Sequence, residues 1–336
     1  MLPGKIPPDV LKTLVFSHLG SYDPDIILGP AVGEDASLIQ IGENVVVAAT
    51  DPITGSIEDI GWLAVHINAN DIATFGVAPR WFLVSILLPP ASSPDDLARI
   101  MEQINRASES LGISVAGGHT EITEGIDRPI LTGFMMGITS PGGYVTSAGA
   151  RTGDHIIMTK TAAIEGTAIL ATEGEEILSA RLGKNVVSDA CEMRGQISVV
   201  KEGVTAFGTG YLTAMHDPTE GGLSGGLHEL CDASDVGFRI DLDRIPVHDV
   251  TRQVCDMLSI DFMELISSGC MLMTCDPDHS EDVVSALHSV GVLATVIGTI
   301  ESESKDRTFM SKGEVKPLPR PSTDALWHAL NRLSQT

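Results

Sequence analysis

The stretch Val45-Val46-Val47-Ala48-Ala49-Thr50-Asp51 (residues 45–51) decides the fold of the first half of the chain. Six small or β-branched residues in a row predict a buried strand, and Asp51 ends it. A second apolar run, residues 81–88, is closed by two prolines. Between the two runs, residues 61–75 have the length and composition of a helix that ends at Gly76. This succession predicts a sheet with helices packed against it.

The same alternation continues to the end of the 336 residues. Ser93 and Pro94 predict the start of a helix that Gly112 stops, and a strand at 113–116 then leads into a glycine pair. Glycine and proline around residues 140–143 indicate a break. We therefore expect an α+β protein of two domains, residues 1–145 and 146–336. The second domain has predicted strands at 154–159, 270–274 and 293–300, and predicted helices at 163–171, after 216–226 and at 324–333.

Composition and charge exclude several classes of function. The chain has 45 acidic and 21 basic side chains and a formal net charge of −24, so nucleic acids and anionic membranes would be repelled. No export signal or membrane span is visible, and we expect a cytoplasmic protein. The five cysteines are scattered without a CxxC pair, which favours free thiols over a zinc site or disulfides.

Acidic motifs stand at the ends of apolar elements in the first half. They are Gly33-Glu34-Asp35-Ala36, Thr50-Asp51-Pro52 and Asn68-Ala69-Asn70-Asp71. Such carboxylates can gather around Mg²⁺, which prefers hard oxygen ligands, at a phosphate-binding surface. Asn68 and Asp71 are three residues apart on the predicted helix and therefore share a face. Each acid alone is more often a cap or turn residue, whereas the three motifs together favour a metal site.

The second half contains one glycine-rich motif, His216-Asp217-Pro218-Thr219-Glu220-Gly221-Gly222-Leu223. Two glycines at the start of a helix leave free amide groups that can hold a phosphate. The spacing matches neither a P-loop nor a dinucleotide-binding fingerprint, and tight packing of a glycine-rich helix is the simpler explanation by spacing alone.

Taken in order, these motifs resemble the AIR synthase-related (PurM-like) superfamily of ATP-binding proteins over nearly the whole chain. The resemblance rests on Gly33-Glu34-Asp35-Ala36, Thr50-Asp51, Asn70-Asp71-Ile72-Ala73 followed by Gly76-Val77-Ala78-Pro79, Gly117-Gly118-His119-Thr120, and the motif at 216–222. Residues 29–35, 59–64 and 216–222 look most like the hydrogenase expression/formation protein HypE. The resemblance implies a PurM-like fold whose N-terminal domains form a dimeric β-sheet core.

The resemblance also implies an ATP and Mg²⁺ site across a homodimer. In that arrangement Asp35, Asp51 and Asp71, with Gly33 beside them, would bind the metal that bridges the ATP phosphates. Gly117, Gly118 and His119 would lie near the phosphates, and Asp217, Gly221 and Gly222 would face the acceptor from the second domain. Asp217 and His119 are the implied catalytic residues. His119 stands where relatives carry an acid, which leaves the number of metal ions open.

HypE proteins resemble carbamoyl dehydratases, so the resemblance implies an ATP- and Mg²⁺-dependent enzyme that activates an amide or carboxyl-type oxygen by phosphoryl transfer. The acceptor would be a small molecule or a group carried by a protein. The printed sequence has no cysteine after Cys275, so we expect this chemistry without the C-terminal thiol of HypE. Two alternatives stay open: a small-molecule kinase of the thiamine-monophosphate kinase type, and a nucleotide-binding maturation partner with little turnover.

Overall fold

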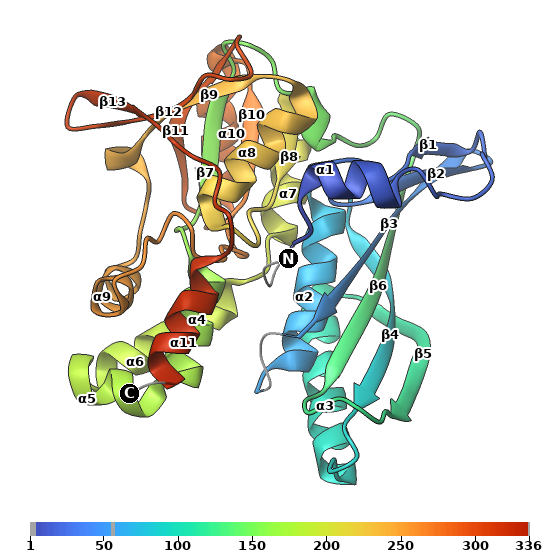
Figure 1. Ribbon diagram of the computed structural model, residues 1–336. Helices are drawn as coiled ribbons and strands as arrows, with labels where there is room; N and C mark the ends of the chain where they lie inside the picture. The colour runs from blue at the N-terminus through green and yellow to red at the C-terminus, as the bar shows by residue number, and fades with distance from the viewer. Residues whose placement is uncertain (1–4, 55–57, 335–336) are drawn as a thin grey trace.

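The computed structural model describes residues 5–54 and 58–334. It contains one β-sheet in each half of the chain, and helices lie between and around the two sheets (Figure 1). This mixture of strands and helices confirms the predicted α+β class. The segment that joins the last strand of the first sheet to the first strand of the second covers residues 140–154. The division at residues 145 and 146 stays a prediction.

The first sheet has the strand order β1-β2-β3-β6-β4-β5, antiparallel throughout except for the parallel pair of β4 and β5. Its strands are β1 (Ile26–Leu28), β2 (Ser37–Ile41), β3 (Asn44–Ile53), β4 (Pro79–Leu88), β5 (Ser114–Ile122) and β6 (Ile130–Thr139). The helices of this half are α1 (Pro8–Val10), α2 (Ile60–Ala73) and α3 (Pro94–Leu111). The predicted order of strand, helix and strand at 45–88 is therefore confirmed.

The second sheet has the order β13-β12-β9-β11-β7-β10-β8. Its strands are β7 (His155–Thr159), β8 (Leu212–His216), β9 (Gly237–Asp241), β10 (Leu272–Cys275), β11 (Ala294–Glu301), β12 (Arg307–Ser311) and β13 (Glu314–Pro317). Helices α4 (Ile164–Glu173), α5 (Glu175–Leu182), α6 (Lys184–Glu192), α7 (Val200–Phe207), α8 (Gly222–Ser234), α9 (Asp249–Leu258), α10 (Ser280–Ser289) and α11 (Ala325–Ser334) complete this half.

Helix α3 forms as its sequence predicts. The Ser93 side chain accepts the Asp96 backbone N–H, and the Asp96 side chain accepts the Ser93 N–H, which together make a capping box. Gly112 ends the helix in the left-handed conformation at φ 67°.

Helix α2 joins the two halves. Every residue from Ile60 to Ala73 except Trp62 is buried, because the helix packs on the first sheet on one side and on α7 on the other (Figure 1). The Asn70 side-chain amide binds the backbone of the second half: it donates to the Ile197 carbonyl (3.0 Å) and accepts from the Val199 N–H (2.8 Å). An asparagine in the middle of a buried helix is thereby fully paired across the junction.

Strand β5 differs from its prediction. The expected strand at 113–116 runs straight through Gly117 and Gly118 to Ile122 as an edge strand parallel to β4. Gly118 has no room for a side chain, since a Cβ there would lie 2.0 Å from the Val84 carbonyl oxygen. The close approach of two strands, rather than of a ligand, accounts for this glycine in the single chain.

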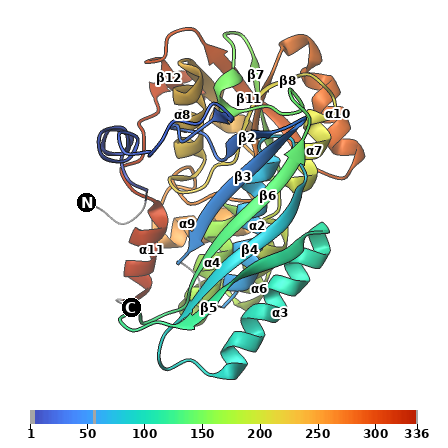
Figure 2. The same cartoon turned by 90° about the vertical axis from the view of Figure 1, so that its right-hand side faces the viewer.

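One face of the first sheet carries no helix. Figure 2 shows β3, β6, β4 and β5 in front, with α2 behind them. Apolar side chains on this face are only partly buried, among them Leu83, Phe134 and Met136. Within the described part of the chain no helix is long and apolar enough to cross a membrane, and the five cysteines are free, as expected.

The contact between α2 and α7 gives a stability test. Gly203 of α7 lies so close to α2 that an added Cβ would be 2.2 Å from the Ala73 carbonyl oxygen. We expect Gly203→Ala to lower the free energy of unfolding by about 1–3 kcal/mol, although alanine favours helices over glycine. Urea unfolding measures this, with Gly195→Ala as the control because nothing lies within 4 Å of a Cβ there. Equal stability of the two variants would show that the contact is not tight.

Candidate functional site

Four aspartates from different elements converge at the junction of the two halves, and we call them the acid cluster. Asp35 precedes β2, Asp51 lies on β3, Asp71 lies on α2 and Asp217 directly follows β8. Asp35, Asp51 and Asp217 all raise the pKa of Asp71 by repulsion, so the four carboxyls lie within electrostatic reach of one another. The structure thus brings together the three predicted metal ligands and one predicted catalytic residue.

The negative form of Asp51, Asp71 and Asp217 is disfavoured. Asp217 is 0% exposed and neither of its carboxylate oxygens has a hydrogen-bond partner among the described residues. Burial, followed by repulsion from Asp35, raises its pKa to about 8. Burial also raises the pKa of Asp51 to about 6 and that of Asp71, which is 6% exposed, well above the ordinary range. A cation at this site would be bound favourably, since it would relieve the repulsion.

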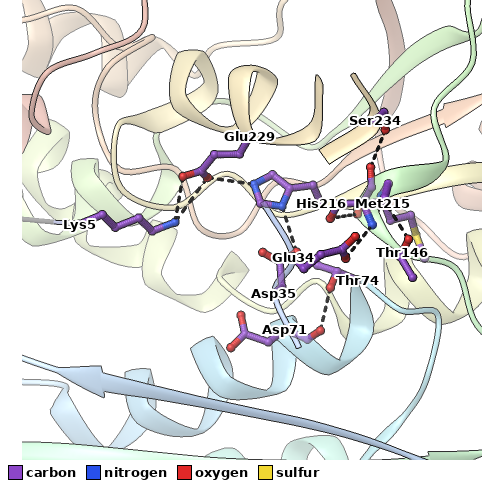
Figure 3. Close-up of polar contacts among 12 residues, drawn as sticks. Lys5, Glu34, Asp35, Asp71, Thr74, Thr146, Met215, His216, Glu229 and Ser234 are labelled. Carbon is purple, nitrogen blue, oxygen red and sulfur yellow. Dashed lines mark hydrogen bonds and ion pairs between the residues drawn. The ribbon is translucent and has the colours of Figure 1, made fainter. Parts of the chain in front are cut away.

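His216 ties the acid cluster to α8. Its Nδ1 lies 3.0 Å from Asp35 Oδ2 and its Nε2 lies 3.1 Å from Glu229 Oε2 (Figure 3). Burial opposes a charge on this imidazole, but attraction to Asp35 and Glu229 outweighs it and raises the pKa to about 10. His216 is therefore a cation at neutral pH, in contact with both Asp35 and Glu229.

A second cation comes from the start of the described chain. The Lys5 ammonium lies 3.4 Å from Glu229, and its backbone N–H donates to Glu220 at 2.7 Å. Burial opposes the negative form of Glu229, but Lys5 and His216 together lower its pKa to about 2. Figure 3 shows this chain of contacts from Lys5 through Glu229 and His216 to Asp35, beside Asp71.

Packing fixes the geometry of two predicted positions. Gly33 has φ 83°, and a Cβ there would lie 2.5 Å from the Glu229 carbonyl oxygen, so only glycine lets this loop approach α8. Asn68 accepts the Asp51 backbone N–H at 2.9 Å and donates to the Asp51 carbonyl at 3.3 Å. Asn68 therefore positions Asp51, and its amide is not free to be a ligand as its spacing from Asp71 suggested.

The start of α8 differs from the expectation of free amides. The Gly221 N–H donates to Asp324 Oδ2 at 2.6 Å and the Gly222 N–H donates to the Thr219 carbonyl at 3.0 Å. A Cβ on Gly222 would lie 2.6 Å from the Leu265 carbonyl oxygen, so the glycines serve tight helix packing in this structure. Their contact with a nucleotide stays a prediction, and it requires these bonds to open.

Gly117, Gly118 and His119 do not join the acid cluster within one chain. They lie on β5, and strands β6 and β4 separate β5 from β3, which carries Asp51. The His119 side chain is 63% exposed and its Nε2 lies 3.0 Å from Glu121 Oε2. Only a second chain could bring these residues to an acid cluster.

The donor set fits a magnesium ion held jointly with a ligand. Across residues 5–54 and 58–334, no group of three or more His, Cys, Asp or Glu is arranged to hold a metal ion by itself. Mg²⁺ commonly takes only one or two carboxylates and completes its shell with phosphate oxygens and water. The unpartnered oxygens of buried Asp217 and the crowded carboxyls around it suit that mode.

Sequence reasoning missed three residues of the site. His216 was quoted only as the first residue of a motif, although it directly precedes Asp217. Glu229 lies seven residues after Gly222, which places it on the same face of α8. Lys5 carries no local signal, because its contacts are with residues more than 200 positions away.

The crowding of the acid cluster predicts a pH-dependent gain of stability in Asp217→Asn. A carboxyl whose pKa is raised on folding destabilises the folded state increasingly as pH rises from about 4 toward 8. We expect the free energy of unfolding of the variant, relative to the native chain, to be higher at pH 8 than at pH 5 by about 1–3 kcal/mol.

Urea unfolding without nucleotide or metal measures this difference. Asp189→Asn is the control, because Asp189 is an exposed residue of α6 and its replacement should act equally at both pH values. An equal effect of Asp217→Asn at pH 5 and pH 8 would contradict the buried, repelled state of this carboxyl.

Relatives of this chain are known. A hydrogenase expression/formation protein of Methanocaldococcus jannaschii is 29% identical over 311 residues, which cover 90% of each chain. The carbamoyl dehydratase HypE of Rhizobium leguminosarum bv. viciae is 27% identical over 280 residues, covering 81% of this chain and 78% of that protein.

Solved structures share the fold. Escherichia coli HypE superposes with a TM-score of 0.74 at 22% identity, covering 84% of this chain and 88% of that one. A HypE in complex with ATP gives 0.69 at 20% identity, covering 96% and 97%. The thiamine-monophosphate kinase of Aquifex aeolicus, complexed with AMPPCP and TMP, gives 0.70 at 20% identity, covering 87% and 91%. These structures confirm the two-domain PurM-like fold.

Two family models match the sequence. The N-terminal domain of AIR synthase related proteins covers residues 33–139, and the C-terminal domain covers residues 151–311. The two matches lie in the family's order and span most of the 336 residues, so this chain belongs to the AIR synthase related proteins.

Proposed function

We propose that this chain is an ATP- and Mg²⁺-dependent enzyme of the HypE-like branch, which activates an amide or carboxyl-type oxygen by phosphoryl transfer. The bond between the terminal phosphorus of ATP and its bridging oxygen breaks, and that oxygen leaves as part of ADP. A bond from the same phosphorus to the acceptor oxygen forms. The observation that carries the proposal is the convergence of Asp35, Asp51, Asp71 and Asp217 at the junction of the two halves. Relatives named as carbamoyl dehydratases and a HypE complexed with ATP support it.

The residues of the site would act mainly by positioning and charge. Bound Mg²⁺ would supply neutralisation of the phosphate charge. His216 holds the Asp35 carboxylate through a hydrogen bond, and the paired amide of Asn68 fixes the backbone at Asp51. Asp217, with a pKa of about 8, can hold a proton at its carboxylate oxygens near neutral pH and release it as the local charge becomes more positive. This supports a role of Asp217 as the catalytic acid or base toward the acceptor.

A homodimer would complete the site. The uncovered sheet face with Leu83, Phe134 and Met136 offers an apolar surface that a second copy would bury. In such a dimer His119, Gly117 and Gly118 of one chain would lie near the nucleotide of the other. A maturation partner protein is the further partner that relatives named for hydrogenase expression and formation support.

A small-molecule kinase remains the second candidate, because the thiamine-monophosphate kinase fold matches this chain as well as most HypE structures do. The two functions differ in their products. A kinase releases ADP and a phosphorylated metabolite, whereas the first proposal gives ADP and a dehydrated or aminated compound.

Binding of nucleotide tests the acid cluster directly. Calorimetric titration of the native chain with Mg·ATP should give one saturable heat signal, and ATP without Mg²⁺ should bind weakly because the cluster would repel it. Asp71→Asn should weaken Mg·ATP binding by at least about tenfold, since it removes a carboxylate from the metal site. Asp189→Asn on α6 is the matched control. Absence of heat with the native chain, or unchanged affinity in Asp71→Asn, would overturn the proposal.

The contribution of His119 in trans can be tested with mixed dimers. We expect His119→Ala and Asp71→Asn each to weaken Mg·ATP binding. Coexpression of the two variants with different tags yields heterodimers in which one site carries both substitutions and the other carries neither. If the site forms between chains, purified heterodimers should bind about half the native amount of Mg·ATP with native affinity. Heterodimers without any native-affinity site would show that one site uses His119 and Asp71 of the same chain, and native affinity in His119→Ala alone would put His119 outside the site.

A further inference from the structure

A second feature of the junction is an apolar cavity of about 560 Å³ beside the acid cluster. Ile53, Leu63 and Ile67 line it from the first half, and Ile169, Ile266 and Leu326 line it from the second. Asp51 reaches both this cavity and the acid cluster. The volume and the apolar walls suit the body of a small molecule, with one end next to Asp51.

Three buried side-chain atoms in the lining of this cavity have no hydrogen-bond partner among the described residues; one is the Ser268 hydroxyl oxygen, and the other two belong to Glu165 and Trp327. Glu165, in the first turn of α4, is 5% exposed and its Oε2 is unpartnered. Nε1 of Trp327, on α11, is also buried and unpartnered. Figure 1 shows α11 lying along α4. A buried carboxyl oxygen without a partner is unfavourable, so both groups point to a ligand that supplies the missing bonds.

The charges around the cavity select the kind of ligand. Asp51, Glu165, Glu220 and Asp324 line it, and Lys5 is the one basic residue among its lining. Asp324 is already satisfied by the backbone N–H groups of Gly221, Ile266 and Leu326. Glu220 accepts the Lys5 backbone N–H. Apart from Asp51, which belongs to the acid cluster, Glu165 is therefore the acid left to receive a donor, and the acidic lining disfavours an anionic ligand.

We propose that this cavity binds a small amphipathic amine, with its apolar body against the aliphatic walls and its protonated nitrogen donating to Glu165. The indole N–H of Trp327 then donates to an oxygen or nitrogen acceptor of the same molecule. That this molecule also carries the oxygen that accepts the phosphoryl group rests on the proposed function, because it depends on the neighbouring acid cluster. The binding itself does not.

Ligands of equal length and different charge test the proposal. Hexylamine, hexanol and hexanoate are titrated calorimetrically into the native full-length chain without nucleotide. We expect hexylamine to bind at least about tenfold more tightly than hexanol, because a buried charged hydrogen bond contributes more than a neutral one, and hexanoate not to bind. Equal affinity for the amine and the alcohol, or preference for hexanoate, would overturn the proposal.

Two variants locate the binding. Glu165→Gln keeps the shape of the side chain and removes its charge, so hexylamine affinity should fall at least about tenfold while hexanol affinity changes less than about twofold. The control is Glu176→Gln on exposed α5, which should change neither. Ile169→Phe fills the cavity from α4 and should weaken all binding, so it decides the location even if Glu165→Gln fails to fold. Unchanged amine affinity in folded Glu165→Gln, or in Ile169→Phe, would overturn the assignment.

The outcome for Mg·ATP is read separately. If Mg·ATP binds and hexylamine does not, the proposed amine site is overturned and the proposed function stands. If hexylamine binds and Mg·ATP does not, the amine site stands, but its role in phosphoryl transfer is overturned together with the proposed function.

Discussion

Repulsion among buried carboxyls is the constraint around which the junction of this molecule is built. Asp35, Asp51, Asp71 and Asp217 come from elements that the fold must bring together, and burial prevents water from screening them. Two cations, His216 and Lys5, contact one side of the cluster through Asp35 and Glu229. Both also attract Asp217, but burial and repulsion among the acids outweigh this attraction and keep the pKa values of Asp71 and Asp217 raised, which favours a ligand that brings positive charge.

The same junction explains where structural and binding roles separate. Asn68 and Asn70 lie just before Asp71 on α2, and both amides are bonded to backbone groups of the site and of the second half. They set the positions of Asp51 and of residues 197–199. Asp71 follows them in the same motif, and its carboxyl is the one that the other acids repel, so the amides hold the fold and the acid remains for chemistry.

The sequence could predict most elements because their signals are local. The capping box at Ser93, the break at Gly112 and the apolar run before Asp51 depend only on neighbouring residues, and the structure confirms them. The glycine pair of β5 was expected near the phosphates of a ligand, because a single sequence does not reveal that β4 lies too close to Gly118 for a side chain. The acid cluster was predicted through its motifs, whereas Lys5 and Glu229 were missed because only the tertiary fold places them beside His216.

The enclosure of α2 has a consequence for synthesis of the chain. An apolar helix that is covered on one side by its own sheet and on the other by α7 cannot be fully buried while only the first half has left the ribosome. Translation of residues 74 to 203 takes on the order of ten seconds at ordinary elongation rates. During that interval the apolar surface of α2 is exposed to solvent, and binding of a chaperone to the nascent chain at this stage would protect it.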